Sequence, residues 1–471
     1  MNTHSFKYKA VFCLLTCISL VSCKGFLEVG PPVDSITTPL VFNNDDAAKS
    51  AMLGIYSNMA NDGFASGAIN SVTALTGLCA DETVNYNSSY NNFYNNALLA
   101  GSDINPWEFI YNKIYATNAI LEGISNNPNL TAPLKRQLEG ESKFVRAFCY
   151  FYLTNLYGDV PLNLNTDFRV NALKTKTSQD QIYQQIITDL KEAQTLLTDQ
   201  YYSSERVRPN KVAATALLAR VYLYTKQYAL AESTANGVIS NTSLYTLKDD
   251  LSQVFLKNST EAIWQLQPNV NGLNTNEGDL FIIQVNPTGV SLIPDLVNAF
   301  DDSDQRKNKW IGQITIESNT YYFPYKYKIR SANSTGTLQE YSMVLRLAEQ
   351  YLIRAEARIN QNKIELGIED LNILRQRARP NPSPNVPNPL SPIPSSLSQT
   401  DALLAVEKER RLEMFCEWGH RWFDLKRTNR ADAVIPLLKS NWKSTHQLWP
   451  IPQADLNNNS SLTQNPGYAV Q

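Results

Sequence analysis

Residues 409–427 read ERRLEMFCEWGHRWFDLKR, and this stretch decides how the rest of the chain is interpreted. Its large apolar side chains recur at steps of three or four residues, namely at Leu412, Phe415, Trp418, Trp422 and Leu425. That period places them on one face of a helix, so the pattern predicts a single amphipathic helix with one apolar stripe. Gly419 lies inside the pattern, where glycine weakens a helix, and it predicts a close approach of another part of the backbone.

The charged residues of this stretch are also spaced as on a helix surface. Glu413, Glu417 and Arg421 follow each other at steps of four, and Asp424 precedes Arg427 by three residues. Side chains at these spacings are neighbours on a helix and can form ion pairs there. We therefore expect a buried structural helix that contacts no ligand.

Three segments of the chain resemble a known family. Residues 409–427 resemble the signature of the SusD-like (RagB-like) nutrient-binding outer-membrane lipoproteins, and residues 146–162 (RAFCYFYLTNLYGDVPL) resemble another signature of that family. The closing segments LWPIPQ (residues 448–453) and QNPGY (residues 464–468) resemble the family's C-terminal strap. The resemblance implies a mainly α-helical fold, in which tetratricopeptide-like helical pairs form a scaffold around an irregular insert with short β-strands and long loops.

The N-terminus has the pattern of a lipoprotein signal peptide. Lys7 and Lys9 precede a short apolar run, which ends in Leu-Val-Ser-Cys at residues 20–23. The run is too short for a stable membrane span, and a cysteine thiol at this place can take a diacylglycerol. Residues 1–22 are therefore predicted to be removed, with lipid on Cys23. An ordinary signal peptide with a chance cysteine, or a short buried helix, is the alternative.

Composition excludes several classes of function. The 471 residues carry a formal net charge of −2 without basic blocks, which argues against a nucleic-acid partner. After Cys23 only Cys79, Cys149 and Cys416 remain, an odd number without metal-ligand or disulfide spacing. The whole chain has three histidines, and only two of them remain after the first 22 residues are removed. Two are too few for a metal centre with several histidine ligands. We expect no metal and no cofactor.

Helical periodicity dominates the chain. The predicted helices span residues 107–125, 134–157, 181–197, 211–225 and 228–239. Tetratricopeptide-like offsets occur twice, the first time at Leu218, Ala219, Tyr222 and Ala231, and the second time at Ala355, Arg358 and Gly367. Small residues at such offsets let paired helices cross closely, and each pair must stack on the next to bury its apolar face.

The mature chain divides into three parts. Residues 23–248 form an N-terminal helical part with a polar loop at 81–106. Residues 249–339 are an irregular, partly β ligand-binding insert, with expected strands at 262–266, 281–285, 311–316 and 321–323 and a turn at 318–319. Residues 340–471 are a C-terminal helical part with the strap and a loop at 380–394, where seven of 15 residues are proline.

The polar stretch at residues 85–96 is the first candidate ligand site. It holds six asparagines, four aromatic residues and no charge. Asparagine offers both donors and an acceptor to sugar hydroxyls, and aromatic faces suit the apolar face of a pyranose. The candidate contacts are Tyr86, Asn87, Tyr90, Phe93 and Tyr94, together with Asp81, the acidic residue that precedes the loop in the family's arrangement. A mobile polar loop without ligand contacts is the alternative.

Aromatic residues of the insert form the second candidate. Trp310, Tyr321 and Tyr322 are the expected contacts, and Tyr321 and Tyr322 point to opposite faces of one strand. One of those faces must belong to the core. The resemblance implies that the binding platform combines the early loop with this insert.

The resemblance also implies a function. It describes a lipid-anchored outer-membrane protein, facing the cell exterior, that binds an oligosaccharide and delivers it to a SusC-like TonB-dependent transporter. A peptide-binding lipoprotein of the same type is an alternative. A glycoside hydrolase is less well supported, because it needs two carboxylates in a catalytic frame and none is recognisable. A pure protein scaffold is a third reading, and we predict that the chain is not an enzyme.

Overall fold

The protein is described by a computed structural model that covers residues 41–269, 272–331, 337–384 and 386–468. The predicted signal peptide at residues 1–22 and Cys23 lie outside the described residues. Within the described ranges, no helix is both long enough and apolar enough to cross a membrane.

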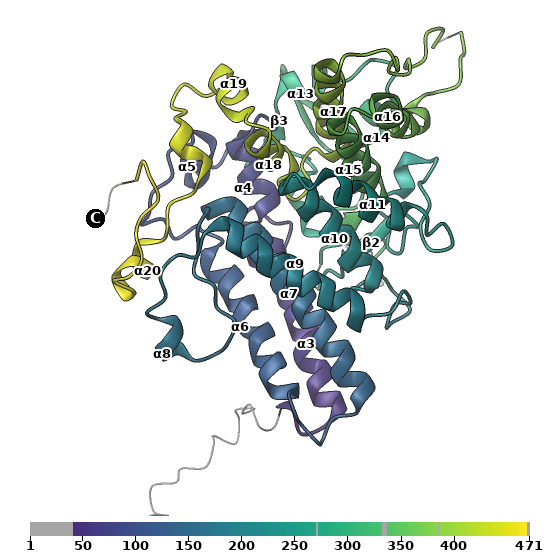
Figure 1. Ribbon diagram of the computed structural model, residues 1–471. Coiled ribbons are helices and arrows are strands. Elements are labelled where there is room, and N and C mark those ends of the chain that lie inside the picture. The colour runs from purple at the N-terminus through teal and green to yellow at the C-terminus, as the bar shows by residue number, and fades with distance from the viewer. Residues whose placement is uncertain (1–40, 270–271, 332–336, 385, 469–471) are drawn as a thin grey trace, which may run out of the picture.

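A series of helices forms the scaffold, and each helix packs against the next one in the series (Figure 1). In order these are α6 (Trp107–Ile124), α7 (Ala132–Tyr157), α9 (Gln179–Leu196), α10 (Lys211–Tyr224), α11 (Tyr228–Ile239), α15 (Leu347–Asn360) and α16 (Ile364–Ala378). Stacked pairs of this kind bury faces that no single pair can bury alone. The arrangement confirms the predicted mainly helical class.

Local signals place the ends of these helices. Pro106 directly precedes α6, where a missing N–H has no consequence for helix hydrogen bonding. Gly158 follows α7 with a φ of 75°, a left-handed value that glycine adopts without steric strain. At the crossing of α15 and α16, a Cβ atom on Gly367 would lie 2.5 Å from Ile359 Cγ1 and 2.8 Å from the Ala355 carbonyl oxygen. The small residue is required for this crossing, as the repeat offsets predicted.

The prediction of one helix over residues 409–427 is wrong. Two helices form instead, α17 (Gln399–Met414) and α18 (His420–Arg427). Between them Cys416, Trp418 and Gly419 take positive φ angles of 52°, 47° and 75°. Left-handed residues cannot continue a right-handed helix, so the chain turns here and the apolar stripe is divided between two helices.

The predicted close approach at Gly419 is confirmed. A Cβ atom on this glycine would lie 2.7 Å from Thr76 Oγ1 of α4 (Val72–Cys79). The neighbouring Trp418 amide donates a hydrogen bond to Thr73 Oγ1 at 3.0 Å. The turn between α17 and α18 is therefore seated on α4, far away in the sequence.

Short antiparallel strand pairs involve the insert, and two of them join it to strands outside it. The strands are β1 (Thr83–Asn85) paired with β3 (Val290–Leu292), β2 (Ala262–Leu266) paired with β6 (Ser342–Arg346), and β4 (Ile311–Ile316) paired with β5 (Asn319–Pro324). The predicted strand at 281–285 is absent from the structure, because α12 (Asn276–Phe281) ends there. The hairpin turn falls on Glu317 and Ser318, one residue earlier than predicted, since Ile316 pairs with Asn319.

Helices outside this series complete the fold. They are α3 (Asp45–Asn61), α5 (Asn91–Tyr94), α8 (Phe168–Asn171), α13 (Pro294–Asn298), α14 (Gln305–Trp310), α19 (Ala431–Val434) and α20 (Gln453–Asn458). Single 3₁₀ turns occur at Gly63–Ala65, Ser88–Tyr90, Leu251–Gln253, Ile435–Leu437 and Ser444–Gln447. The stretch at 85–96, expected as a loop, is thus partly helical.

The C-terminal strap closes the end of α7. The Trp449 amide donates to the Leu156 carbonyl at 2.9 Å, and Asn465 Nδ2 donates to the Tyr157 carbonyl at 2.8 Å. The last carbonyls of a helix have no partner within the helix, so the strap supplies two of the missing donors. The proline-rich stretch at 380–394 contains no helix in its described residues, as predicted.

Candidate functional site

The β1–β3 ribbon positions Tyr86. Val84 lies opposite Ser291 in this antiparallel pair, and the Tyr86 amide extends the ladder by donating to the Gly289 carbonyl at 2.9 Å. The Tyr86 hydroxyl lies 3.1 Å from Ser291 Oγ. The backbone and the hydroxyl of Tyr86 are both held by the β3 segment, while 39% of the residue remains exposed.

The β4–β5 hairpin brings Tyr321 to the same place. The rings of Tyr86 and Tyr321 meet edge to face, with centroids 5.9 Å apart and an interplanar angle of 80°. Tyr321 is half-buried. This contact joins the early polar stretch to the insert aromatics, which is the combination that the sequence predicted.

Few formal charges occur near the two rings in sequence. Residues 85–96 contain none, and the hairpin at residues 311–324 contains only Glu317, which is exposed in its turn. Asn87 is half-buried and uses its Oδ1 to accept from the Ser89 amide at 3.1 Å. Tyr322 is half-buried and packs against the hydrophobic core from the opposite strand face. We name Tyr86, Asn87 and Tyr321 the paired-tyrosine surface.

Asp81 has a structural role, contrary to the prediction. It is buried and receives two hydrogen bonds from Arg421, at 2.7 Å from Nε and 2.9 Å from Nη2. Burial alone would raise the pKa of Asp81, but the Arg421 guanidinium outweighs it and the pKa is lowered. Its carboxylate therefore remains charged and is paired with Arg421 of α18.

Other predicted contacts also belong to the core. Trp310 and Phe93 are buried, and Phe93 packs edge to face on Trp449 with centroids 5.3 Å apart. Tyr90 is buried, and its hydroxyl donates to Asn70 Oδ1 at 2.6 Å. Tyr94 is half-buried beneath the Lys439 ammonium. Protein cores and ligand-binding surfaces are both rich in aromatic side chains. The amino-acid composition of the stretch therefore could not distinguish core residues from ligand contacts.

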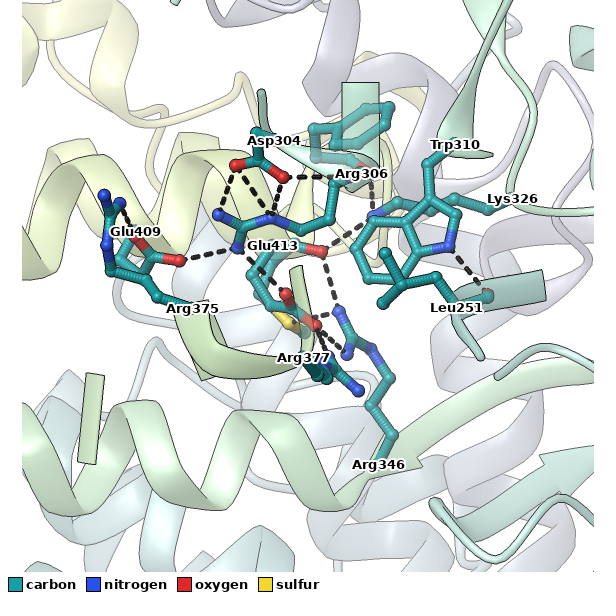
Figure 2. A network of polar contacts seen from close by, with 12 residues as sticks. Leu251, Asp304, Arg306, Trp310, Lys326, Arg346, Arg375, Arg377, Glu409 and Glu413 are labelled. Atoms are coloured by element: carbon teal, nitrogen blue, oxygen red, sulfur yellow. Dashed lines mark hydrogen bonds and ion pairs between the residues drawn. The ribbon is translucent and has the colours of Figure 1, made fainter. Parts of the chain in front are cut away.

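A buried ion network holds both ends of the hairpin (Figure 2). Arg306 and Trp310 of α14 lie just before β4, and Lys326 follows β5. Arg306 bonds to Asp304 and Glu409, at 2.7 Å and 2.6 Å. The network therefore ties both ends of the hairpin to α17.

Lys326 completes the anchorage on the other side. Its ammonium donates to the Glu413 and Phe415 carbonyls at 2.8 Å and 2.9 Å, and it pairs with Glu417 at 2.5 Å. It also lies 5.0 Å from the Trp310 ring centroid. These contacts explain why Trp310 is buried and why Tyr321 is presented from a firmly held hairpin.

A buried carboxyl lies directly before β1. Glu82 Oε1 accepts a hydrogen bond from the Cys416 amide at 3.1 Å, and burial raises the pKa of Glu82 to about 7. The contact links β1 to the turn between α17 and α18. Within the described residues, no group of three or more histidine, cysteine, aspartate or glutamate side chains is placed to hold a metal ion.

Comparison with known proteins identifies the family. Residues 25–223 match a family model described as starch-binding and associating with the outer membrane, and residues 299–468 match the SusD family model. The chain belongs to the SusD-like family. SusD-like protein P2 of Formosa agariphila is 25% identical, over 98% of this chain and 100% of its own length.

Solved SusD-like structures share the fold. One from Bacteroides fragilis superposes with a TM-score of 0.78 at 21% identity, covering 93% of this chain and 100% of its own. Another, described as a laminarin-binding SusD-like protein, gives a TM-score of 0.73 at 22% identity, covering 90% and 100%. SusD-like proteins are non-catalytic, outer-membrane-associated proteins, and this chain is accordingly not an enzyme.

One element of this SusD-like site escaped the sequence analysis. The strand β3 has only three residues, too few for an alternating pattern, and Ser291 carries no motif. A short strand becomes visible only through its partner, here β1. The sequence before β3 contains Pro287 and Gly289, and these two residues indicate a turn. They do not indicate that a strand follows the turn.

Proposed function

We propose that this SusD-like protein binds a neutral oligosaccharide at the paired-tyrosine surface. The contact between Tyr86 and Tyr321 carries the proposal, because it gathers exposed aromatic area from two distant segments at one place. Ring faces can stack on the apolar face of a sugar, and neighbouring amides such as Asn87 can exchange hydrogen bonds with its hydroxyls. The description of a structural neighbour as laminarin-binding supports a glycan as the ligand class.

Firm anchorage of the hairpin favours binding. A surface that is already ordered loses little conformational entropy when a ligand arrives, so more of the contact energy appears as affinity. The buried pairs of Arg306 and Lys326 supply that order. We propose that the ion network serves recognition by holding Tyr321 opposite Tyr86.

We further propose a lipid-anchored protein at the cell exterior. Cys23 carries the anchor, and a SusC-like TonB-dependent transporter receives the ligand. The support is family membership together with the Leu-Val-Ser-Cys box at residues 20–23. In this proposal the stacked helices offer the transporter an extended surface, while the paired-tyrosine surface presents the glycan.

Calorimetry with laminarin and a panel of neutral glycans tests the ligand site. Tyr86→Ala and Tyr321→Ala should each weaken binding by about 1–3 kcal/mol, the range for truncated aromatic contacts. Tyr202→Ala is the matched control, because Tyr202 is 47% exposed and lies between α9 and α10. Binding should also change little with salt, since formal charge contributes little to stacking.

Three results would refute this assignment. Folded Tyr86→Ala and Tyr321→Ala proteins that bind as tightly as wild type would place the site elsewhere. A steep loss of binding in modest salt would indicate a charged peptide ligand instead. Shortening of the glycan that survives repurification of the protein would indicate a glycoside hydrolase.

A further inference from the structure

One cavity of the molecule has a lining that includes none of the paired-tyrosine residues. It has a volume of about 350 Å³ and is bounded by α6, the segment at residues 161–172 that includes α8, and α20. Figure 1 shows these three elements together at one side of the helical scaffold. Cavities of this size hold small ligands in other proteins.

Amides are the commonest polar side chains in the wall of this cavity, beside several apolar ones. The wall includes Asn112, Asn118, Asn163, Asn165, Asn171 and Asn458. Asp455 is the only carboxylate among the described lining residues, and neither lysine nor arginine is among them. We name this site the asparagine cavity. Its wall offers donors and acceptors without a formal positive charge, so it does not suit an anion.

Two of the amides have an unused acceptor. The Oδ1 atoms of Asn163 and Asn171 are buried and have no hydrogen-bond partner among the described residues. The other end of the Asn171 amide is already used, because its Nδ2 donates to the Asn165 carbonyl at 2.9 Å. Buried acceptors are nearly always satisfied in folded proteins, and because these two oxygens have almost no accessible surface, a bound water is the expected donor.

Two exposed aromatic rings lie at the edge of the same cavity. Tyr115 of α6 is 57% exposed and Phe168 of α8 is 76% exposed. Asp167 caps α8 by accepting a hydrogen bond from the Arg169 amide at 3.0 Å. This bond stabilises the short helix that begins with Phe168. Large aromatic residues exposed to this extent beside a concave wall that carries several amides suggest contact with a ligand.

We infer that the asparagine cavity is a second binding site for a neutral oligosaccharide. The inference rests on the proposed function for its ligand class. Sugar hydroxyls can exchange hydrogen bonds with the exposed amides of Asn112 and Asn458 while Tyr115 and Phe168 contact the apolar face of the ring. An apolar protein segment would satisfy the rings but would remove water from the exposed amides of Asn112 and Asn458 without replacing its hydrogen bonds, which is costly. A carbohydrate satisfies both kinds of surface.

The test separates the two sites by mutation. The first protein carries Tyr86→Ala and Tyr321→Ala, so that only the asparagine cavity can bind. Calorimetry with laminarin fragments and other neutral glycans should still detect binding. Adding Tyr115→Ala and Phe168→Ala should then weaken it about tenfold or more, as for aromatic contact residues elsewhere. Leu173→Ala is the control, since Leu173 is 70% exposed and outside the cavity lining.

Each outcome decides between the two sites. Residual binding that depends on Tyr115 and Phe168 but not on Leu173 supports the second site. If Tyr86→Ala and Tyr321→Ala abolish all binding, the proposed function stands and the second site is refuted. If only Tyr115→Ala and Phe168→Ala reduce binding, the asparagine cavity stands and the paired-tyrosine assignment fails.

Two further outcomes overturn the inference. Wild-type protein that binds no glycan of the panel refutes both sites. Residual binding that falls equally with Leu173→Ala, or capture of a transporter through this face without any effect on glycan affinity, shows a protein-docking surface instead. Tyr86, Tyr115, Phe168 and Leu173 are exposed and Tyr321 is half-buried, so circular dichroism and thermal melts must show that each variant folds like wild type before affinities are compared.

Discussion

Replacing Glu413 with glutamine should destabilise the protein strongly. Glu413 is fully buried in α17, where its Oε1 bonds Arg346 Nη1 at 2.6 Å and its Oε2 lies 3.1 Å from Arg306 Nη1 (Figure 2). Arg377 is a third partner on Oε1. The substitution keeps the shape of the side chain but removes the one charge that these guanidinium groups share.

The contacts determine the size of the effect. Glutamine has one acceptor oxygen, which can retain Arg346 and Arg377, but its amide would then point donor hydrogens at Arg306. Loss of one charge-assisted hydrogen bond costs about 1.5–3 kcal/mol. The two remaining bonds weaken without the carboxylate charge, so the total falls in the range of about 3–5 kcal/mol seen for broken buried pairs.

Urea denaturation at neutral pH, followed by tryptophan fluorescence and circular dichroism, measures this loss. Glu369→Gln is the matched control, because Glu369 is exposed on α16 and should change stability by less than about 0.5 kcal/mol. Burial raises the pKa of Glu413 and its arginine partners lower it, with a lowered pKa as the net result. Its contribution is therefore complete above the unfolded pKa and disappears as the pH falls toward the folded pKa.

Two results would refute this reasoning. Glu413→Gln could match Glu369→Gln in unfolding free energy at neutral pH, which would mean that the network adds nothing. Alternatively, the difference between wild type and Glu413→Gln could persist undiminished in strong acid. In that case the loss would come from packing and not from charge.

Three further predictions concern Cys23, Gly419 and Glu277. Cys23→Ala should move the protein from the membrane fraction to the soluble fraction without detergent, and equal membrane retention would contradict lipidation of Cys23. Gly419→Ala should lower stability by about 1–3 kcal/mol in thermal or urea unfolding, because its φ is 75° and its Cβ would lie 2.7 Å from Thr76 Oγ1; an unchanged unfolding free energy would contradict this. Burial raises the pKa of Glu277 from 4.5 to about 7, so the folded state retains a proton that the unfolded state releases, and stability falls as pH rises between these values. Glu277→Gln should remove that part of the pH dependence, about 1–3 kcal/mol, and an identical pH profile for both proteins would refute the assignment.

Helices of the scaffold could be predicted because their signals are local. Pro106 before α6 and Gly158 after α7 act through their own backbone preferences, so neighbouring sequence is sufficient to place these ends. Gly419 was the only local sequence signal for the break between α17 and α18. Cys416 and Trp418 take left-handed angles there because contacts with α4 and with Glu82, just before β1, stabilise the turn, and no local sequence pattern indicates those contacts.

Charge partners show the same division. The predicted pair of Asp424 and Arg427 forms, with a distance of 2.7 Å, because both residues lie on α18. Glu417 and Arg421 were expected to pair with helical neighbours, but the break separates them. Glu417 pairs with Arg346 and Lys326 instead, and Arg421 pairs with Asp81.

The sequence by itself determined the helical class, most helix ends, the proline-rich loop and the family. Periodicity, capping and motifs depend on residues that are close together in the sequence. Only the tertiary structure decided which aromatic residues are available to a ligand. Tyr86 and Phe93 belong to one polar stretch, yet one meets Tyr321 at the surface and the other packs on Trp449. Exposure depends on what distant segments cover, and that is fixed when β1 pairs with β3 and the strap closes over α7.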